Sequence, residues 1–193
     1  MDASNDFRVL ATDAATSARR LLGCILEREI DGQTVRVKIV ETEAYDQNDP
    51  ASHSVTGPAG RAKTMFMAAG HSYVYFTYGM HYCCNIVTGV EGFGSGALIR
   101  AVEPLGGAEI LSQNRGGRVG VVMTNGPAKL CQALGITRDL DGHDLHKSPL
   151  RLIMQPAIRN EDIAFGARIG ISRAVDTPWR FYLKGNPYVS AKS

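Results

Sequence analysis

The sequence predicts a mixed α/β fold: one compact domain over residues 1–193, a curved, largely antiparallel sheet with surrounding helices, and a protruding aromatic hairpin. Its alternating apolar and polar runs follow one another as hairpins, not as strand–helix–strand crossovers. The 193-residue length suits one domain, and no repeat or linker divides the chain. Hydrophobic residues at 44% and charged residues at 21% are typical of a packed globular protein.

The N-terminal part predicts a helix followed by a hairpin. Ala and Leu recur at helical spacing over roughly 13–22, Thr12 or Asp13 can cap the start, and a glycine follows the end. The segments CILEREI and QTVRVKIVETEAY are rich in β-branched residues and are joined by Asp-Gly, which favours a tight turn. Glu43 and Tyr45 therefore come where a strand leaves the sheet, a common position for functional side chains.

The rest of the chain predicts loops, strands and two short helices. Residues 46–63 are rich in Asp, Ser, Gly and Pro and predict a long loop. SYVYFTYGMHYCCNIVT predicts two aromatic strands that meet near Gly79, and GALIRAVEP predicts a strand that Pro104 ends. The remaining predictions are a helix over 106–115, a helix over 127–134 capped by Asn125, and a last strand in WRFYLKGNPYVS.

Composition limits the cellular setting more than it indicates a function. The formal net charge of +2 permits a phosphate-binding face without indicating one. Four cysteines without a regular framework are typical of a reduced, intracellular protein: Cys24, Cys83, Cys84 and Cys131. The polar N-terminus lacks signal-peptide features, and no apolar run reaches the ~20 residues of a membrane helix. We expect a soluble protein of the cytoplasm, nucleoid or nucleus, without membrane contact.

Metal and nucleotide cofactors are not expected. Cys83 and Cys84 are adjacent, so on a strand they point to opposite faces and cannot bind one ion together. The chain has no Cys-x-x-Cys motif, and His53, His71 and His81 do not supply zinc-site spacing. GFGSG lacks the spacing of a phosphate-binding loop and is typical of a turn.

Several motifs occur in a characteristic order along the chain. ETEAY, a downstream His53, YVYFTYGMHYCCN, LIRAVEP, GPAKLCQAL and ARIGI follow one another between Leu21 and the C-terminal NPYVS. Together they resemble the alkyladenine (3-methyladenine) DNA glycosylase family. The resemblance implies a monofunctional enzyme of base excision repair, a DNA N-glycosylase that flips alkylated or deaminated purines and hydrolyses the N-glycosidic bond.

The resemblance assigns catalysis to Glu43, which would be ionised and would activate the attacking water. Arg100 and the backbone carbonyl of Ile169 would hold the same water. Position alone would make a strand-end glutamate a solvated surface residue and Arg100 a salt-bridge partner. We expect Glu41 to face away from the site and to serve as a structural control.

Four residues would bind the extruded base. The resemblance places Tyr45 on one face of the purine and His53 and Tyr75 on the other, with the His53 N–H at a purine edge. Asn85 would crowd the 2-amino group of guanine. Aromatic faces attract cationic purines such as 3-methyladenine. The pattern alone also fits core packing, because aromatic residues in strands commonly form cross-strand pairs.

Two residues would contact DNA outside the base pocket. Tyr78, at the tip of the YGM turn, would wedge into the duplex, and Lys129 would contact phosphate. The expected partner is double-stranded DNA containing a damaged purine, bound by a monomer. Two alternatives remain open: a small-molecule N-glycosidase, which needs no exposed tyrosine, and a non-catalytic binder of damaged DNA, which needs no Glu43.

Overall fold

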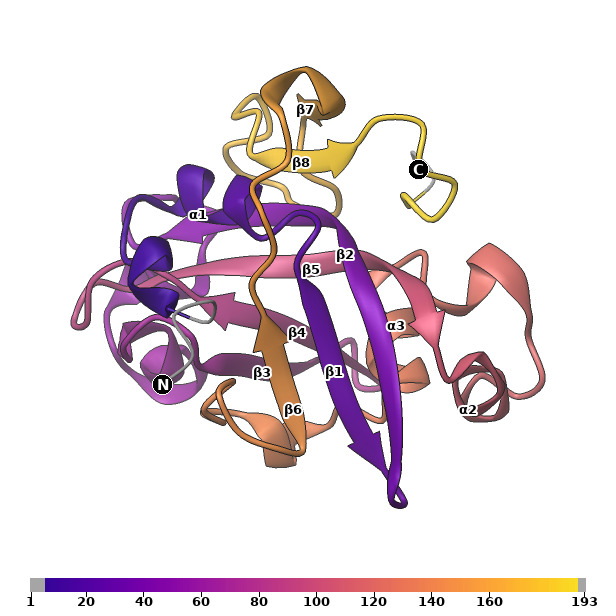
Figure 1. Ribbon diagram of the computed structural model, residues 1–193. Helices are drawn as coiled ribbons and strands as arrows, with labels where there is room; N and C mark the ends of the chain where they lie inside the picture. The colour runs from indigo at the N-terminus through magenta and orange to yellow at the C-terminus, as the bar shows by residue number, and fades with distance from the viewer. Residues whose placement is uncertain (1–5, 191–193) are drawn as a thin grey trace.

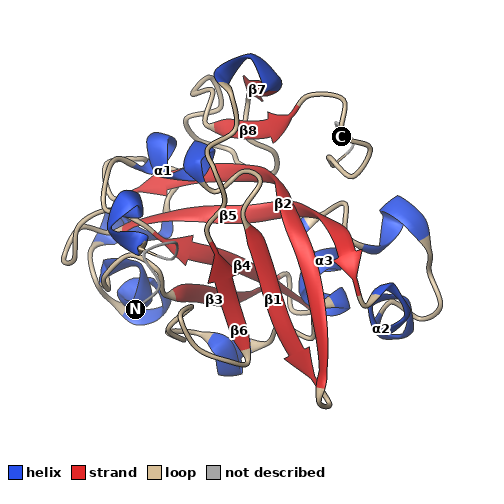
Figure 2. Ribbon diagram, viewed as in Figure 1, coloured by secondary structure: helices blue, strands red, loops and turns tan. Residues whose placement is uncertain are grey.

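An eight-stranded antiparallel sheet forms the centre of the computed structural model, which describes residues 6–190 (Figures 1 and 2). The strand order is β3-β4-β5-β2-β1-β6, while β8 pairs with both β2 and β7. These pairings confirm the predicted mixed α/β fold with an antiparallel sheet. The strands are β1 (Ile25–Ile30), β2 (Gln33–Asp46), β3 (Ser72–Thr77), β4 (His81–Val87), β5 (Ser95–Gly106), β6 (Leu150–Ile153), β7 (Ile163–Gly166) and β8 (Arg180–Leu183).

Short helices surround the sheet (Figure 2). The α-helices are α1 (Ala14–Arg20), α2 (Ala108–Asn114) and α3 (Pro127–Ala133). The 3₁₀ helices are Phe7–Leu10, His53–Thr56, Gly60–Phe66, Gly120–Met123, Arg138–Leu140 and Asn160–Asp162. Within residues 6–190, none of the helices has the length and apolar character needed to cross a bilayer.

The helix caps agree with the sequence at α1 and differ at α3. The Asp13 side chain accepts a hydrogen bond from the Thr16 N–H and caps α1. The prediction that Asn125 caps α3 was wrong, because Gly126 occupies the cap position. The Asn125 side chain instead accepts a hydrogen bond from Lys129, one helical turn further along. A cation four residues away thus takes the oxygen that would have served as the cap.

β2 is the strand around which the sheet is organised. β5 pairs with it from Arg36 to Asp46, while its other edge pairs with β1 over residues 33–38 and with β8 over residues 41–43. Glu43 therefore faces Leu98 on one side and Arg180 on the other. Irregular register between β2 and β5 around Glu41 marks a bulge, which bends a strand and increases its twist. The site-bearing end of β2 is consequently enclosed on both edges.

One strand prediction needs correction, and two strands were not predicted. Strand β5 continues past Pro104 to Gly106, because Pro104 lies beside a register shift where a missing N–H is tolerated. The strands β6 and β7 were not predicted, and each is only four residues long. β6 pairs with β1, and β7 pairs with β8 at the top of Figure 1.

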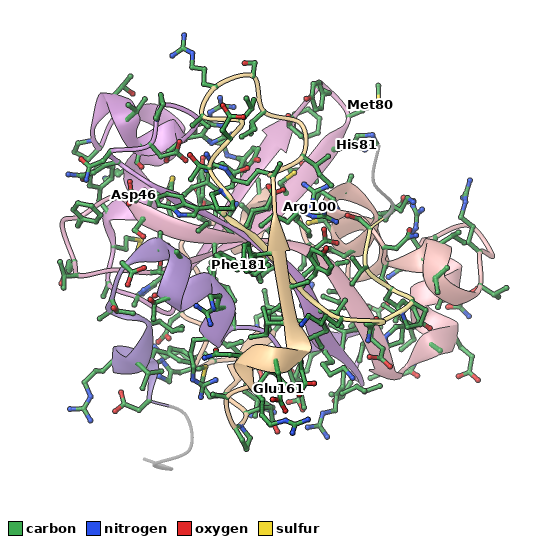
Figure 3. All side chains as sticks on the ribbon, turned by 90° about the horizontal axis from the view of Figure 1, so that it is seen from above. Asp46, Met80, His81, Arg100, Glu161 and Phe181 are labelled. Carbon is green, nitrogen blue, oxygen red and sulfur yellow. The ribbon has the colours of Figure 1, made fainter. Side chains whose placement is uncertain are left out.

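The β3–β4 hairpin turns through two consecutive residues with positive φ, Tyr78 at 51° and Gly79 at 66°. The side chains of Tyr78 and Met80 are 83% and 67% exposed, so they contribute little to the core. Figure 3 shows Met80 and His81 at the periphery and Arg100 nearer the centre of the molecule. The hairpin therefore presents large apolar side chains to solvent at its turn.

Candidate active site

A cleft with a volume of about 630 Å³ lies beside the β3–β4 hairpin and the end of β2. Seven of the nine predicted site residues line it: Tyr45, His53, Tyr75, Tyr78, Asn85, Arg100 and Ile169. The other two, Glu43 and Lys129, are not among its lining residues. The predicted loop over 46–63 contributes to the wall and contains a 3₁₀ helix that begins at His53.

The carboxylate of Glu43 lies behind the cleft wall and has no exposed surface. Its Oε1 accepts a hydrogen bond from the Ile169 N–H at 2.8 Å and lies 3.2 Å from Nη1 of Arg100. Its Oε2 accepts a hydrogen bond from the Tyr45 hydroxyl at 2.7 Å. All three donors belong to residues that line the cleft. The carboxylate is therefore fixed in orientation, and Arg100 compensates its charge.

The expectation that Glu41 faces away from this site was wrong. Strand residues two apart share a face, and Glu41 is as fully buried as Glu43. Glu41 accepts hydrogen bonds from Nε of Arg180 at 2.6 Å and from the N–H and hydroxyl of Ser190. Arg100 lies between the two glutamates, with its Nε 3.5 Å from Oε1 of Glu41. Glu41 is thus part of the charge network that supports Arg100.

His53 is held at the cleft by two tyrosines of β3. Its Nδ1 lies 2.8 Å from the Tyr73 hydroxyl. Its ring packs edge-on against the Tyr75 ring, with 4.6 Å between the ring centroids. Burial, assisted by the positive charge of Arg61, lowers the pKa of His53 from 6.5 to about 4. The imidazole is therefore neutral near neutral pH. Sequence reasoning missed Tyr73, although its position two residues before Tyr75 places it on the same face of the strand.

Asn85 and Cys83 form part of the cleft floor on β4. The two positions are two residues apart, so both side chains lie on the same face of the strand. Nδ2 of Asn85 donates a hydrogen bond to the Tyr73 carbonyl at 3.0 Å, which orients the amide. Burial raises the pKa of the Cys83 thiol. The Asn85 amide is therefore held by β3, and the Cys83 thiol is not ionised near neutral pH.

Comparison with known proteins assigns the chain to a family. A family model described as methylpurine-DNA glycosylase matches residues 8–187. The chain belongs to this family. A relative from Carboxydothermus hydrogenoformans, provisionally named a 3-methyladenine DNA glycosylase, is 49% identical over 183 residues, which cover 94% of this chain and 96% of the relative. A relative with the same provisional name from Methanoculleus marisnigri is 45% identical over 93% of this chain and 95% of its own length. Another from Nitrosospira multiformis is 43% identical over 97% of this chain and 92% of its own length.

The protein is therefore a DNA N-glycosylase of the methylpurine type, and its substrate is DNA. Besides Tyr73, two arginines that line the cleft of this glycosylase were not predicted from the sequence, Arg61 and Arg173, and both are exposed. The only available signals were a basic residue inside the polar segment GPAGRAK and another just after ARIGI. Lys129, in contrast, donates a hydrogen bond to Oδ1 of Asn125 at 2.8 Å.

Metal ligation has no support in the part of the glycosylase that the structure describes. Over residues 6–190, no group of three or more His, Cys, Asp or Glu side chains is arranged to hold an ion. The four cysteines are buried and free.

Proposed function

We propose that this glycosylase flips an alkylated or deaminated purine from duplex DNA into the cleft and hydrolyses its N-glycosidic bond with a water activated by Glu43. Expected lesions are 3-methyladenine, 7-methylguanine, hypoxanthine and ethenoadenine. The observation that supports this most is the Glu43 carboxylate, held against the cleft wall by Tyr45, Arg100 and Ile169. Such a fixed acceptor is what a general base requires.

The reaction balances with water as the only co-reactant. The water oxygen forms a bond to C1′ of the deoxyribose, its proton passes to Glu43, and the electrons of the broken C–N bond leave with the base. A cationic purine leaves as a neutral base, and Glu43 then releases its proton to solvent. A neutral purine leaves as an anion and takes up one proton, so that the overall reaction adds one water. Because Glu43 has no exposed surface, the water must displace one of its donors, and we assign this exchange to the Tyr45 hydroxyl. Arg100 and the carbonyl of Ile169 would complete the contacts of the water.

The aromatic wall would select the base. Tyr45 would stack on one face of the purine, and His53 with Tyr75 would contact the other face. A π face attracts a cation by ~0.5–2 kcal/mol, which favours methylated, cationic purines. The low pKa of His53, about 4, supports this role, because a neutral imidazole does not repel a cationic base. Asn85, held by Tyr73, would crowd the 2-amino group of guanine.

Tyr78 would occupy the space that the flipped base leaves in the duplex. Its side chain is 83% exposed at the hairpin turn, which gives it no structural function in the free protein. Flipping costs a few kcal/mol, and stacking of an aromatic ring on a base returns ~1–3 kcal/mol. For phosphate contacts, the exposed Arg61 and Arg173 are better placed than Lys129, which must first leave Asn125.

The experiment that tests this function compares three substrates. Purified protein is incubated with a duplex holding one hypoxanthine, with the matched undamaged duplex, and with free inosine, and base release and abasic sites are measured. Release from the damaged duplex alone is expected. Release from free inosine but not from the duplex would instead indicate a small-molecule N-glycosidase. Binding of damaged duplexes without release from any lesion would indicate a silent binder.

A further inference from the structure

Arg168 is a buried cation directly behind the cleft wall. Its side chain has no exposed surface, and its guanidinium pairs with the buried carboxylate of Asp49, with Nη2 3.1 Å from Oδ1. Nη1 also donates a hydrogen bond to the Ala44 carbonyl at 2.9 Å. A charge is buried in a protein only when it is well paired, so this geometry is maintained by strong interactions. The proposed mechanism gives Arg168 no role.

The guanidinium of Arg168 stacks on the ring proposed to receive the base. Its Cζ lies 4.6 Å from the centroid of the Tyr45 ring and 5.5 Å from that of Trp179. Tyr45 lines the cleft, whereas the side chain of Arg168 has no exposed surface and packs against the Tyr45 ring. The next residue, Ile169, donates its N–H to Glu43. Arg168 therefore belongs to the same segment that holds the carboxylate.

We infer that Arg168 is a positioning residue that shifts the preference of the glycosylase from cationic toward neutral damaged purines, an inference that rests on the proposed stacking of the base on Tyr45. An aromatic face attracts a cation through its quadrupole. A positive charge already bound behind the ring opposes a second positive charge in front of it, and this repulsion is strong in a partly desolvated site. A neutral purine carries no net charge and does not experience this charge–charge repulsion.

Asp49 sets how much of this charge the cleft senses. As the ion-pair partner of Arg168, it offsets part of the positive potential behind Tyr45. Removing only the Asp49 charge should therefore increase the discrimination against cationic bases. Removing both charges together should relieve it. The two changes therefore shift the preference between cationic and neutral bases in opposite directions. A loss of packing around Tyr45 would not produce such opposite shifts.

The experiment uses two variants of the full chain, Asp49→Asn and the double variant Arg168→Met with Asp49→Asn. Single-turnover rates of base release are measured on duplexes containing 7-methylguanine, which is cationic, or hypoxanthine, which is neutral. The double variant is expected to raise the ratio of the 7-methylguanine rate to the hypoxanthine rate about three- to tenfold. Asp49→Asn is expected to lower the same ratio. Misplacement of Tyr45 alone would reduce both rates without these opposite shifts.

Trp179, the single tryptophan of the chain, provides a control for folding, because its fluorescence reports the packing beside Arg168. If Asp49→Asn fails to fold, the double variant decides the question alone, since it leaves no unpaired buried charge. Ratios that stay unchanged, or that move in the same direction in both variants, overturn the inference. A wild-type protein that releases neither base refutes the proposed function itself, and the inference falls with it.

Discussion

The hydroxyl of Tyr45 donates a hydrogen bond to Oε2 of Glu43 across 2.7 Å, which joins the proposed base-stacking residue to the proposed general base. The two residues are two positions apart in β2, so their side chains lie on the same face of the strand. The contact defines a position beside Glu43 that a water molecule can take over when the hydroxyl moves. The two proposed roles, stacking of the base and activation of the water, would thus belong to one strand end.

Replacing Tyr45 separates the role of its ring from that of its hydroxyl. Tyr45→Phe should keep most of the single-turnover rate, because the ring remains and the water no longer displaces a hydroxyl. Tyr45→Leu should lower base release by about fivefold to a hundredfold, since stacking on a base contributes ~1–3 kcal/mol. The rates are measured on a hypoxanthine duplex. An equal loss in both variants would assign the function to the hydroxyl instead.

Tyr78 should matter only where a base must be extracted from a paired duplex. Tyr78→Ala is expected to slow release from a paired lesion by about fivefold to a hundredfold and to change release from single-stranded DNA much less. Any L residue at this φ of 51° bears a similar backbone strain, so the effect reports the side chain. Tyr78→Trp, which retains a stacking surface, is the control. Matching losses on paired and single-stranded substrates would refute the wedge.

His53 should make folding stability depend on pH. Its pKa falls from 6.5 to about 4 on folding because burial favours the neutral imidazole. Between these values the unfolded chain binds a proton that the folded chain does not, so the free energy of unfolding should decrease as pH falls from 6.5 toward 4. Urea titrations measure it, and His53→Gln should show a shallower decrease. Identical pH profiles for the two proteins would contradict this.

Glu41 should contribute to stability far more than a glutamate in a partly exposed pair. Removing one partner of a buried ion pair costs about 3–5 kcal/mol, and Glu41→Gln leaves Arg180 and Arg100 without that carboxylate. Glu103 pairs with Lys38 where both side chains are partly exposed, so Glu103→Gln should cost about 0–1 kcal/mol. Chemical denaturation compares the two variants. Similar losses in both would show that the buried network adds nothing beyond a surface pair.

Local signals in the sequence were sufficient for the elements that depend on near neighbours. The Asp-Gly turn predicted the β1–β2 hairpin, and the aromatic repeat predicted the β3–β4 pair. Thr12 or Asp13 was expected to cap α1, and Asp13 does so. Strands β6 and β7 could not be predicted in this way. Each has four residues, and β6 forms only because β1, more than a hundred residues earlier in the chain, offers an edge for pairing.

The site was predictable where motifs reach the cleft, and not where contacts come from distant segments. Six of the seven predicted residues that line the cleft come from β2 to β5 and their connections, so the motif order follows consecutive strands. The seventh, Ile169, lies between β7 and β8 and was predicted only from the motif ARIGI. Arg168 escaped notice, since its partner Asp49 is 119 positions away and nothing local marks a buried cation. Glu41 was misjudged for a local reason, because it lies two residues before Glu43 in β2 and so shares its face of the strand. Its partners Arg180 and Ser190 come from the end of the chain and had no local signal.

The most direct test of the account is the single-turnover rate of base release by Glu43→Gln on a hypoxanthine duplex, with Glu103→Gln as a matched control. A positioned general base contributes ~10²–10⁴-fold, so Glu43→Gln should lose a factor in that range while still binding the duplex. Glu103→Gln should retain the wild-type rate. A Glu43→Gln protein that releases hypoxanthine at nearly the wild-type rate would contradict the account.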